Sequence, residues 1–353
     1  MKKYKLALVG ATGVVGITAR KVLEEKKLPI SEYVFFASKK SAGQKIEFMG
    51  EEYIVRELKE NSFDEGFDFA IFSAGGGTSK KFSPIAASKG CIVVDNSSAF
   101  RMDENVPLIV PEVNPEEIKN NNGIIANPNC STIQAVVPLK PLDEKYRIKR
   151  VVYSTYQAVS GAGKYGISDL EKGIENYKSS NQKEKVYENI GVKDEGKLDY
   201  ELEKFPYPIF NNCLPHIDIS LENGYTKEEE KMINETRKIL KRPDLAVTAT
   251  TVRVPVFNSH SESINVEFEN DFELDELTKV LENAPGVIVQ NDLDSSIYPL
   301  AINVNGYDEV FVGRIRRDYS VKSGINMWVV ADNIRKGAAS NAIQIVEKMI
   351  EEN

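Results

Sequence analysis

Tyr4-Lys5-Leu6-Ala7-Leu8-Val9-Gly10-Ala11-Thr12-Gly13-Val14-Val15-Gly16 is the stretch that decides the fold of this 353-residue chain. Its first six residues are largely apolar and predict a buried strand, and a helical pattern over residues 17–26 follows the glycines. Glycines between a strand and a helix permit a tight turn and let a pyrophosphate reach backbone N–H groups at the helix N-terminus. We therefore expect Gly10 and Gly13 to contact a dinucleotide; the alternative is a tight turn without a ligand.

The second predicted strand indicates which dinucleotide is bound. Residues 33–37 form this strand, and Ser38-Lys39-Lys40-Ser41 follows it. NAD sites usually carry an acidic residue here, which binds the ribose 2′-hydroxyl. Lysines and serines instead suit a 2′-phosphate, so the sequence favours NADP, with Ser38, Lys40 and Ser41 as contacts. The alternative is a solvated basic loop.

The alternation of strands and helices continues through the first third of the chain. We predict strands at residues 67–72, 91–94 and 124–126, with a helix over residues 79–89. This order predicts an α/β fold with a parallel sheet, in which ligands gather at the carboxyl ends of the strands. Ser73 and Gly75 follow one of these strands, and their small size lets a cofactor lie close to the backbone.

A cysteine follows the last of these strands. The segment Asn127-Pro128-Asn129-Cys130-Ser131-Thr132 reads as a turn and then a helix start, because the residue before a proline avoids the helical region. A thiol at a helix N-terminus faces unpaired N–H groups and the positive end of the dipole, which lower its pKa from ~8.5. We expect Cys130 to be a nucleophile; the alternative is a small buried thiol, the role we assign to Cys91.

The second half of the chain is richer in β-branched residues. Strands are predicted at residues 151–159, 245–256, 263–269, 309–316 and 324–331, and residues 164–199 are polar and helix-favouring. Arg253 inside a strand needs an anionic partner if it is buried. His260, placed in a turn at residues 258–262, is positioned to act as a base, whereas His216 beside a proline is interpreted as structural. Apolar residues recur at helical spacing after residue 339, and this final helix is expected to pack on the first domain.

Several charged residues have two interpretations. Arg101 can clamp a phosphate or carboxylate, or it can be a surface arginine in a loop. Glu228 and Lys231 lie three residues apart in a predicted helix over residues 226–240, where a solvated surface contact is the default. Tyr200 and Lys204 match the Tyr-x-x-x-Lys pattern of short-chain reductases, but they lie in a charged surface segment, and we take the match as chance.

Composition and charge exclude several classes of protein. Hydrophobic residues make up 41% of the chain and charged residues 28%, as in an ordinary globular protein long enough for two domains. The formal net charge of -8 disfavours nucleic acid as a partner. No run approaches the ~18 apolar residues of a membrane span, so no membrane is expected. The three cysteines form no disulfide framework, which indicates a cytoplasmic protein, and no metal site is predicted.

Five segments together make the chain similar to the bacterial aspartate-semialdehyde dehydrogenases: residues 10–16, 95–101, 127–132, 157–163 and 253–260. The resemblance extends over essentially the whole chain. It implies a Rossmann-type NADP-binding domain over residues 1–129 and an α/β catalytic and dimerisation domain over residues 130–330, with a partly helical insertion at 164–215. A C-terminal helix, in residues 331–353, would return to complete the first domain. The family works as a homodimer or homotetramer.

The resemblance also implies a reaction, the NADPH-dependent conversion of L-aspartyl 4-phosphate to L-aspartate 4-semialdehyde and phosphate in lysine, threonine and methionine biosynthesis. It makes Cys130 the residue that forms a thioester, His260 the acid/base and Gln157 a residue that positions the substrate. Substrate contacts are implied for Arg253 and Glu228, and phosphate contacts for Arg101, Asn129 and Lys231. Cofactor contacts are implied for Thr12, Gly13, Val14, Val15, Lys40, Ser41, Ser160, Gly161 and Asn333.

One departure and two alternatives remain at this point. Lys40 stands where relatives often carry arginine; it keeps the charge but loses the bidentate geometry, which weakens the preference for NADP over NAD. N-Acetyl-γ-glutamyl-phosphate reductases use the same covalent chemistry, but they usually carry glycine where this chain has Asn129. A non-catalytic NADP-binding sensor, with Cys130 as a core thiol, belongs to a different class and predicts cofactor binding without an acyl-enzyme.

Overall fold

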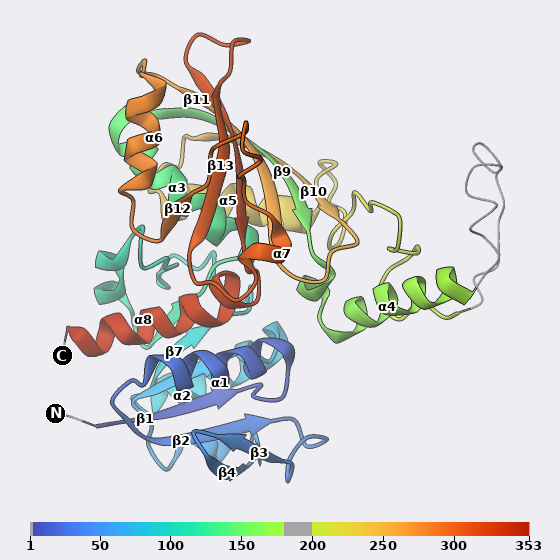
Figure 1. Cartoon of the computed structure of the whole chain (residues 1–353). Coiled ribbons are helices and arrows are strands. Elements are labelled where there is room, and N and C mark those ends of the chain that lie inside the picture. The colour runs from blue at the N-terminus through green and yellow to red at the C-terminus, as the bar shows by residue number, and fades with distance from the viewer. Residues whose placement is uncertain (1–2, 180–199, 353) are drawn as a thin grey trace.

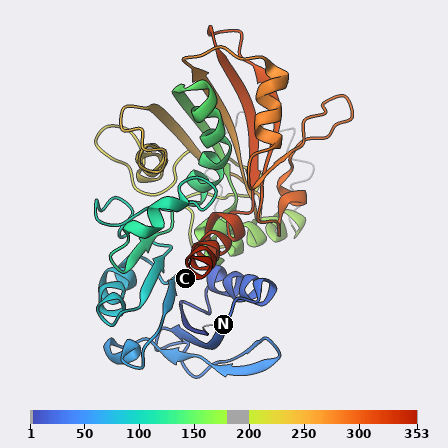
Figure 2. The ribbon, with the colours of Figure 1, turned by 90° about the vertical axis from the view of Figure 1, so that its left-hand side faces the viewer.

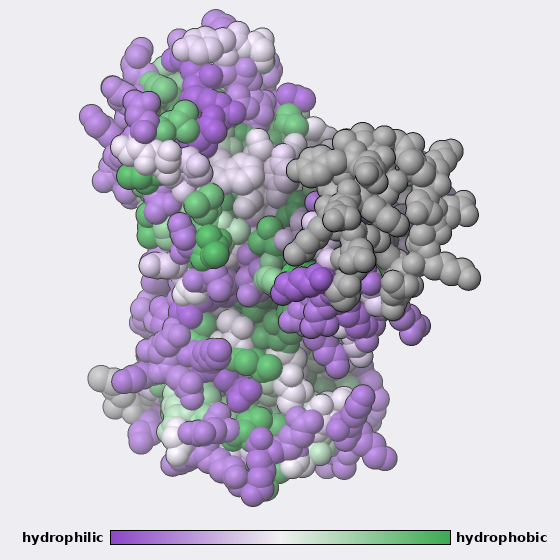
Figure 3. Space-filling view, turned by 45° about the vertical axis from the view of Figure 1, so that its right-hand side comes forward, coloured by the Kyte–Doolittle hydropathy of each residue, from purple (hydrophilic) through white to green (hydrophobic). Residues whose placement is uncertain are grey.

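The computed structural model describes residues 3–179 and 200–352. Two sheets organise the molecule, one in the lower lobe and one in the upper lobe, and the C-terminal helix lies between them (Figure 1). Both ends of the chain lie on the same side of the lower lobe (Figure 1). On the face shown in Figure 3, hydrophilic residues dominate the lower half, and hydrophobic residues gather along the middle of the molecule.

The lower lobe contains a six-stranded sheet in the order β5-β2-β1-β6-β7-β8, and every recorded strand pair in it is parallel. Its strands are β1 (Tyr4–Val9), β2 (Ile30–Ala37), β5 (Arg56–Glu57), β6 (Phe69–Phe72), β7 (Ile92–Asp95) and β8 (Ile124–Ala126). Strand β1 has β2 on one side and β6 on the other, so the strand order reverses at β1. The crevice at such a reversal is where open α/β sheets bind ligands. The predicted parallel α/β sheet is confirmed.

Helices cover both faces of this sheet. Helix α1 (Val14–Lys26) and the C-terminal helix α8 (Ser340–Glu351) share one apolar cluster with β1, β2 and β6. Helix α2 (Gly76–Ser88) packs on the opposite face. A hairpin of β3 (Lys45–Phe48) and β4 (Glu51–Ile54), which the sequence analysis did not predict, closes the outer end. The predicted return of the final helix is confirmed, because its apolar stripe fills the face that α1 leaves open.

The upper lobe contains a six-stranded mixed sheet in the order β10-β9-β11-β14-β13-β12. Its strands are β9 (Ile148–Gln157), β10 (Ala246–Arg253), β11 (His260–Phe268), β12 (Val287–Val289), β13 (Val310–Arg317) and β14 (Gly324–Ala331). Helices α3 (Cys130–Tyr146), α5 (Lys227–Ile239) and α6 (Leu274–Glu282) pack on one face, and their apolar residues belong to one core cluster with the strands (Figure 2).

Two further helices lie at the edges of the upper lobe. Helix α4 (Lys164–Ser179), in the predicted insertion, projects to the side, and α7 (Ala301–Val304) is a single turn (Figure 1). The part of the predicted insertion at residues 180–199 lies outside the described residues. Residues 200–226 form turns and isolated bridges with no helix, so the helical character of the insertion ends with α4 in the described chain.

One local prediction is wrong. Residues 258–262 were expected to form a turn, but His260, Ser261 and Glu262 are the first residues of β11. All three pair with β14, where His260 lies opposite Ala331, and Ser261 and Glu262 also pair with β9 on the other side. Pairing between distant strands overrides the local turn signal. The chain reverses before His260, over residues 254–259, where Ser259 has a left-handed φ of 70°.

Candidate active site

The glycine turn at the start of α1 is shaped by close backbone contacts. A Cβ atom at Gly10 would lie 2.3 Å from the carbonyl oxygen of Ser73, and one at Gly16 would lie 2.1 Å from that of Gly10. Gly13 is the N-cap of α1 and provides no side-chain cap, so amides of the first turn are free of a side-chain partner. These free amides and the helix dipole make the turn a suitable place for a phosphate group.

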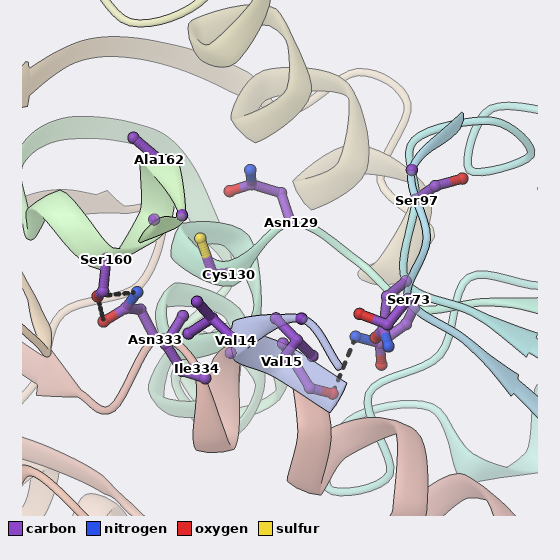
Figure 4. A pocket seen from close by; sticks show the side chains of 18 of the residues that line it. Val14, Val15, Ser73, Ser97, Asn129, Cys130, Ser160, Ala162, Asn333 and Ile334 are labelled. Carbon is purple, nitrogen blue, oxygen red and sulfur yellow. Dashed lines mark hydrogen bonds between the residues drawn. The ribbon is translucent and has the colours of Figure 1, made fainter. Parts of the chain in front are cut away.

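The turn borders a cavity of about 710 Å³, hereafter the cofactor cavity. Cys130 lies between the turn that carries Ser160 and Ala162 on one side and Val14 and Val15 on the other (Figure 4). Of the predicted cofactor contacts, the residues that line this cavity are Thr12, Gly13, Val14, Val15, Ser73, Gly75, Ser160, Gly161 and Asn333.

Four predicted cofactor contacts do not line the cavity. Gly10 lies in the glycine turn but faces the backbone of Ser73 rather than the cavity. Ser38 and Lys40 are exposed and Ser41 is half-buried, in the turn that follows β2. This turn lies beside the glycine turn, because the amides of Gly10 and Ala11 both donate to the carbonyl of Phe36. The structure therefore places the lysine-containing turn next to the glycine turn but outside the cavity wall.

Hydrogen bonds fix the far wall of the cofactor cavity. Asn333 donates from Nδ2 to the Ser160 hydroxyl at 3.0 Å, and its Oδ1 accepts from the Ser259 amide at 2.8 Å (Figure 4). Both side chains are buried. Residues separated by more than 170 positions in the chain thus meet at one wall, although no local pattern links them.

Cys130 is the first residue of α3, as predicted. The helix begins there because the Asn129 side chain accepts from the amides of Ser131 and Thr132, at 3.0 and 3.3 Å. Cys130 as a residue is partly exposed, and it forms no disulfide. It lines the cofactor cavity and also a second cavity of about 400 Å³, hereafter the substrate cavity.

The substrate cavity brings together the residues that, by the resemblance, contact the substrate and the phosphate. Its lining includes Arg101, Asn129, Cys130, Gln157, Glu228, Lys231 and Arg253. They come from a loop of the lower lobe and from α3, β9, α5 and β10. Sequence spacing alone gives no reason for these segments to meet; the packing of α3 and α5 on the upper sheet brings them together.

Glu228 and Lys231 form the acidic and basic centre of this cavity. Lys231 Nζ lies 3.0 Å from Glu228 and 2.8 Å from Asp218, and Asn129 Nδ2 donates to Glu228 at 2.9 Å. Burial raises the pKa of Glu228, but Lys231, Asn129 and Arg253 outweigh burial, so its pKa lies below the ordinary value. The solvated surface contact expected from spacing alone is wrong: α5 packs against α3, and Glu228 is buried.

Arg101 is a buried residue, and its interpretation as a surface arginine is wrong. Its guanidinium lies 3.0 Å from Glu235 and also donates to the backbone carbonyls of Asn96 and Asn127. Glu235 in turn accepts from the Asn129 amide at 2.6 Å. Burial raises the pKa of Glu235 despite the opposing effect of Arg101. The pair connects α5, the lower-lobe loop and the start of α3.

The acidity of Cys130 differs from the prediction. Burial raises the pKa of its thiol to about 12, and the Glu228 carboxylate adds to this rise. Arg253, Arg101 and the Ser131 amide act in the opposite direction but are weaker. The position at a helix N-terminus is therefore correct, whereas the expected lowering of the thiol pKa is not found, because the surroundings desolvate the sulfur and place a carboxylate near it.

His260 is fully buried next to Gly161, and Gly161 lines both cavities. A Cβ atom at Gly161 would lie 3.2 Å from His260 Nε2 and 2.8 Å from a terminal nitrogen of Arg253. His260 Nδ1 accepts from the Ala158 amide at 3.0 Å, so a neutral ring carries its proton on Nε2, which has no partner among the described residues. Burial, followed by Arg253, holds the pKa of His260 well below its ordinary value. The neutral ring thus offers a free N–H donor beside the cavities.

Arg253 has the anionic neighbour that its burial requires. Its guanidinium donates to the Ala158 carbonyl at 2.8 Å. Burial lowers the pKa of Arg253, and the nearby Glu228 carboxylate opposes that effect. Gln157 Nε2 lies 3.4 Å from Glu228 Oε1, so the amide, the carboxylate and the guanidinium face one region. Such a group can bind an amino acid by its carboxylate and amine.

Two residues at or beside this site, Lys204 and Gly337, carried no motif that assigned them to it. Lys204, assigned to a surface segment, lines the substrate cavity. Gly337 lies against Cys130, because a Cβ atom there would be 2.7 Å from Cys130 Cβ. A glycine inside the final helical pattern was the only signal for this contact. His216 is exposed and lines neither cavity, so it is not part of this site.

Two features are absent from residues 3–179 and 200–352. No helix in these ranges has the length and apolar character needed to cross a membrane. No group of three or more His, Cys, Asp and Glu side chains in the same ranges could hold a metal ion.

Comparison with known proteins gives one consistent answer. Residues 5–121 match the family model "Semialdehyde dehydrogenase, NAD binding domain", and residues 139–336 match "Semialdehyde dehydrogenase, dimerisation domain". The chain is 54% identical to the aspartate-semialdehyde dehydrogenase of Aquifex aeolicus over 99% of this chain and 98% of that protein.

Solved structures agree with the sequence comparison. Aspartate semialdehyde dehydrogenase II of Vibrio cholerae, described as complexed with ASA, has a TM-score of 0.91 and 41% identity, over 100% of this chain and 99% of that one. The Candida albicans enzyme, described with NADP, has a TM-score of 0.73 and 25% identity, over 99% and 98% of the two chains. The paired cavities around Cys130, the two matching domain models and these relatives show that the chain belongs to the aspartate-semialdehyde dehydrogenase family.

Proposed function

We propose that this chain converts L-aspartyl 4-phosphate reversibly to L-aspartate 4-semialdehyde and phosphate with NADPH, in lysine, threonine and methionine biosynthesis. One observation carries the proposal: Cys130 lines both the cofactor cavity and the substrate cavity. A nucleophile in this position can be acylated from the substrate side while its acyl group remains accessible from the cofactor side. The ASA complex of the Vibrio cholerae relative and the NADP of the Candida albicans relative support the same assignment.

The first domain would hold NADP through the glycine turn. The free amides at the start of α1 suit the pyrophosphate, and Ser38, Lys40 and Ser41, in the neighbouring turn, suit the 2′-phosphate. The remaining contacts would come from the cavity wall, including Ser160, Gly161 and Asn333. When bound, NADPH would supply the hydride of the reaction.

The substrate cavity divides into two regions by charge. We assign Arg253, Glu228 and Gln157 to the carboxylate and amine of the substrate, since an arginine suits a carboxylate and a carboxylate suits an ammonium group. Arg101, Asn129 and Lys231 would hold the phosphate. All six residues lie in one lining with Cys130, which supports a single substrate spanning both regions.

In the proposed reaction the Cys130 thiolate attacks the acyl carbon of the substrate. A C–S bond forms, the bond from that carbon to the phosphate oxygen breaks, and phosphate leaves with the electron pair. After reduction of the thioester, the C–S bond breaks and the thiolate is regenerated. The oxyanion that forms at each stage needs a donor. His260 Nε2 is well suited to this role, because the amides of Ser131 and Thr132 already donate to Asn129.

His260 can act as a base only if its Nε2 atom is free of a proton. While Nδ1 accepts from Ala158, the neutral ring has its proton on Nε2 and donates there. Accepting the thiol proton at Nε2 requires the other tautomer, in which the Ala158 amide loses its acceptor. We therefore propose that His260 takes the Cys130 proton in that less favoured tautomer and then, protonated on Nε2, acts as donor and acid toward the substrate oxygen.

The proposal also covers the oligomeric state of the protein, its cellular compartment and the boundaries of its domains. The match to a dimerisation domain supports a homodimer or homotetramer. The free cysteines suit the reducing cytoplasm. We assign residues 1–129 and 331–353 to the NADP-binding domain and residues 130–330 to the catalytic and dimerisation domain. The packing of α8 on the lower sheet supports this division.

The deciding experiment is phosphate-dependent reduction of NADP with L-aspartate semialdehyde, run beside N-acetylglutamate semialdehyde. We expect turnover with the first substrate only. Turnover with the second substrate alone would assign the chain to the N-acetyl-γ-glutamyl-phosphate reductases. Tight NADP binding with activity toward neither substrate would make the chain a cofactor-binding sensor.

The covalent mechanism predicts the behaviour of Cys130→Ser. A hydroxyl replaces the nucleophilic sulfur, so we expect kcat to fall by at least about a thousandfold. The affinity for NADP, measured by fluorescence titration, should stay within about twofold. Cys213→Ser is the matched control, because Cys213 is exposed and outside both cavities. Unchanged turnover in Cys130→Ser contradicts the thioester mechanism.

A further inference from the structure

Among the residues that the structure describes, the substrate cavity contains one cation that the roles above leave unused. Lys204 lines this cavity with Lys231 and Asp218. Its segment follows the part of the insertion that lies outside the described residues, and the residue itself is exposed at the rim. Across residues 3–179 and 200–352, Lys204 takes part in no ion pair, whereas Lys172 of the same insertion pairs with Glu203.

The charges around the cavity show what Lys204 contributes. Arg101 lies 3.0 Å from Glu235, and Lys231 lies within 3.0 Å of both Asp218 and Glu228. The cations assigned to phosphate are therefore already balanced by carboxylates. A phosphate group carries about −1.5 to −2 charges near neutral pH. Lys204 supplies positive charge that no carboxylate of the described chain offsets.

The backbone at Lys204 is held by a buried carboxylate. Asp169, in α4, is fully buried and accepts from the amides of Glu203, Lys204 and Phe205 at 2.8, 2.9 and 2.9 Å. Bonds from N–H groups to a charged acceptor are among the stronger hydrogen bonds in proteins. We call this group of contacts the Asp169 cage. It orders the rim segment on the helix, so that Lys204 is presented from a defined backbone.

The next residue attaches the segment to the active-site wall. Phe205 packs in a small apolar cluster with Val159 and Leu170. A Cβ atom at Gly166 would lie 3.2 Å from the Phe205 ring and 2.8 Å from Ala162 Cβ. Ala162 lines both cavities. The Asp169 cage and the Phe205 contact together place the Lys204 backbone against the wall that carries Gly161 and Ala162.

We propose that Lys204 is a further phosphate-binding residue of the substrate cavity and that Asp169 positions it there. This inference rests on the proposed function. The ammonium group binds the phosphate that is released from, or added to, the acyl group, and its flexible stem lets it follow that phosphate at the rim. Arg101, Lys231 and Asn129 supply the inner contacts.

The test is steady-state kinetics of Lys204→Met in the full-length enzyme, with inorganic phosphate varied at saturating L-aspartate semialdehyde and NADP. We expect the KM for phosphate to rise about three- to tenfold, with kcat and the KM for semialdehyde within about twofold. Lys204→Arg should recover most of the phosphate affinity. Lys178→Met is the control and should leave all three constants unchanged, because Lys178 is an exposed lysine at the end of α4 and lines neither cavity.

Asp169→Asn tests the positioning step. It weakens the cage and should raise the KM for phosphate in the same direction, while adding little when combined with Lys204→Met, because both changes act through one ammonium group. An unchanged phosphate KM in Lys204→Met, in an enzyme whose wild type is active, overturns the inference and leaves the proposed function intact. A raised semialdehyde KM with unchanged phosphate KM also overturns it. Inactivity of the wild type with both semialdehydes overturns the proposed function itself.

Discussion

The space beside Cys130 depends on a residue without a side chain. Gly337 lies in the π-helical turn Arg335–Ala339, and a Cβ atom there would approach Cys130 Cβ to 2.7 Å. Real Cβ atoms do not tolerate this distance, so α3 or the turn must shift. Shifts of about 1 Å at a reacting group can cost about a hundredfold in rate.

Gly337→Ala is therefore expected to lower kcat by about tenfold to a hundredfold and to reduce the thermal midpoint. Gly77→Ala is the matched control: Gly77 lies in α2 and a Cβ atom there would have no neighbour within 4 Å, so alanine should be neutral or slightly stabilising. Kinetics and thermal unfolding of both variants provide the check. Normal kcat in Gly337→Ala means that the contact does not position Cys130.

Glu262 is a buried acid that the proposed chemistry does not use. It follows His260 by two residues on β11, and neither carboxyl oxygen has a partner among the described residues. Burial raises its pKa well above the ordinary value. The folded-state pKa thus exceeds the unfolded one, so the contribution to stability is fully present below about pH 4 and is lost as the pH rises toward the folded pKa.

Glu262→Gln removes this titration. The unfolding free energy of the wild type should fall relative to that of the variant above about pH 4.5, by at most about 1.4 kcal/mol per pH unit. Urea unfolding between pH 5 and 8 measures the difference. Glu269→Gln, which removes an exposed carboxylate just beyond the same strand, controls for the change in net charge. Parallel pH curves for wild type and Glu262→Gln argue against a neutral acid at this site.

At the scale of elements, two helix starts build the substrate cavity. Helix α3 presents Cys130 at its first position, and α5 presents Glu228 and Lys231 from its first turns. Helix α5 begins with a reciprocal pair of contacts: the Thr226 hydroxyl accepts from the Glu229 amide, and the Glu229 side chain accepts from the Thr226 amide at 2.7 Å. Capping of α5 therefore supports both its stability and the position of Glu228.

Thr226→Ala should reduce the unfolding free energy by about 1 kcal/mol, because the Glu229 amide loses its side-chain acceptor. It should also raise the KM for L-aspartate semialdehyde, since Glu228 lies in the turn that the cap orders. Chemical unfolding and steady-state kinetics measure the two effects. Thr226→Ser keeps the hydroxyl and should restore both values; a serine variant as impaired as the alanine variant would assign the effect to the lost methyl group.

At the scale of the whole molecule, a buried lysine connects the C-terminal segment to the rest of the chain. Lys336 is fully buried and donates to both oxygens of Glu112, at 2.8 and 2.7 Å, and to Gln344 at 2.9 Å. Glu112 precedes β8 in the chain, and Lys336 lies one residue before the glycine that contacts Cys130. The ion pair thus ties the returning helix to the lower lobe beside the active site.

Lys336→Met is expected to cost about 3–5 kcal/mol of unfolding free energy, because it leaves the carboxylate of Glu112 in the interior without its partner. Replacing both residues, as in Lys336→Met with Glu112→Leu, should recover much of this loss. Lys348→Met is the control, since that lysine is exposed in α8 and pairs only with Glu351 among the described residues. Equal stability of Lys336→Met and Lys348→Met contradicts an essential buried pair.

Much of the fold and part of the site followed from the sequence by itself. The apolar run of β1, the glycine spacing and the start of α3 at Cys130 depend on contacts between near neighbours in the chain. The return of α8 followed from its apolar stripe, because such a stripe must be buried. These features are local, so periodicity, turn chemistry and capping determine them.

Only the tertiary structure decided how the site is assembled and how its groups titrate. His260 lies in a strand because β14 pairs with it, and Arg101 is buried because Glu235, 134 residues away, faces it. The raised pKa of the Cys130 thiol arises from burial and from Glu228, which outweigh the local effect of the helix start. Lys204 and Gly337 reach the site through packing of distant segments. Long-range pairing, burial and the electric field of groups far apart in the chain leave no trace in local spacing, so only the folded molecule reveals them.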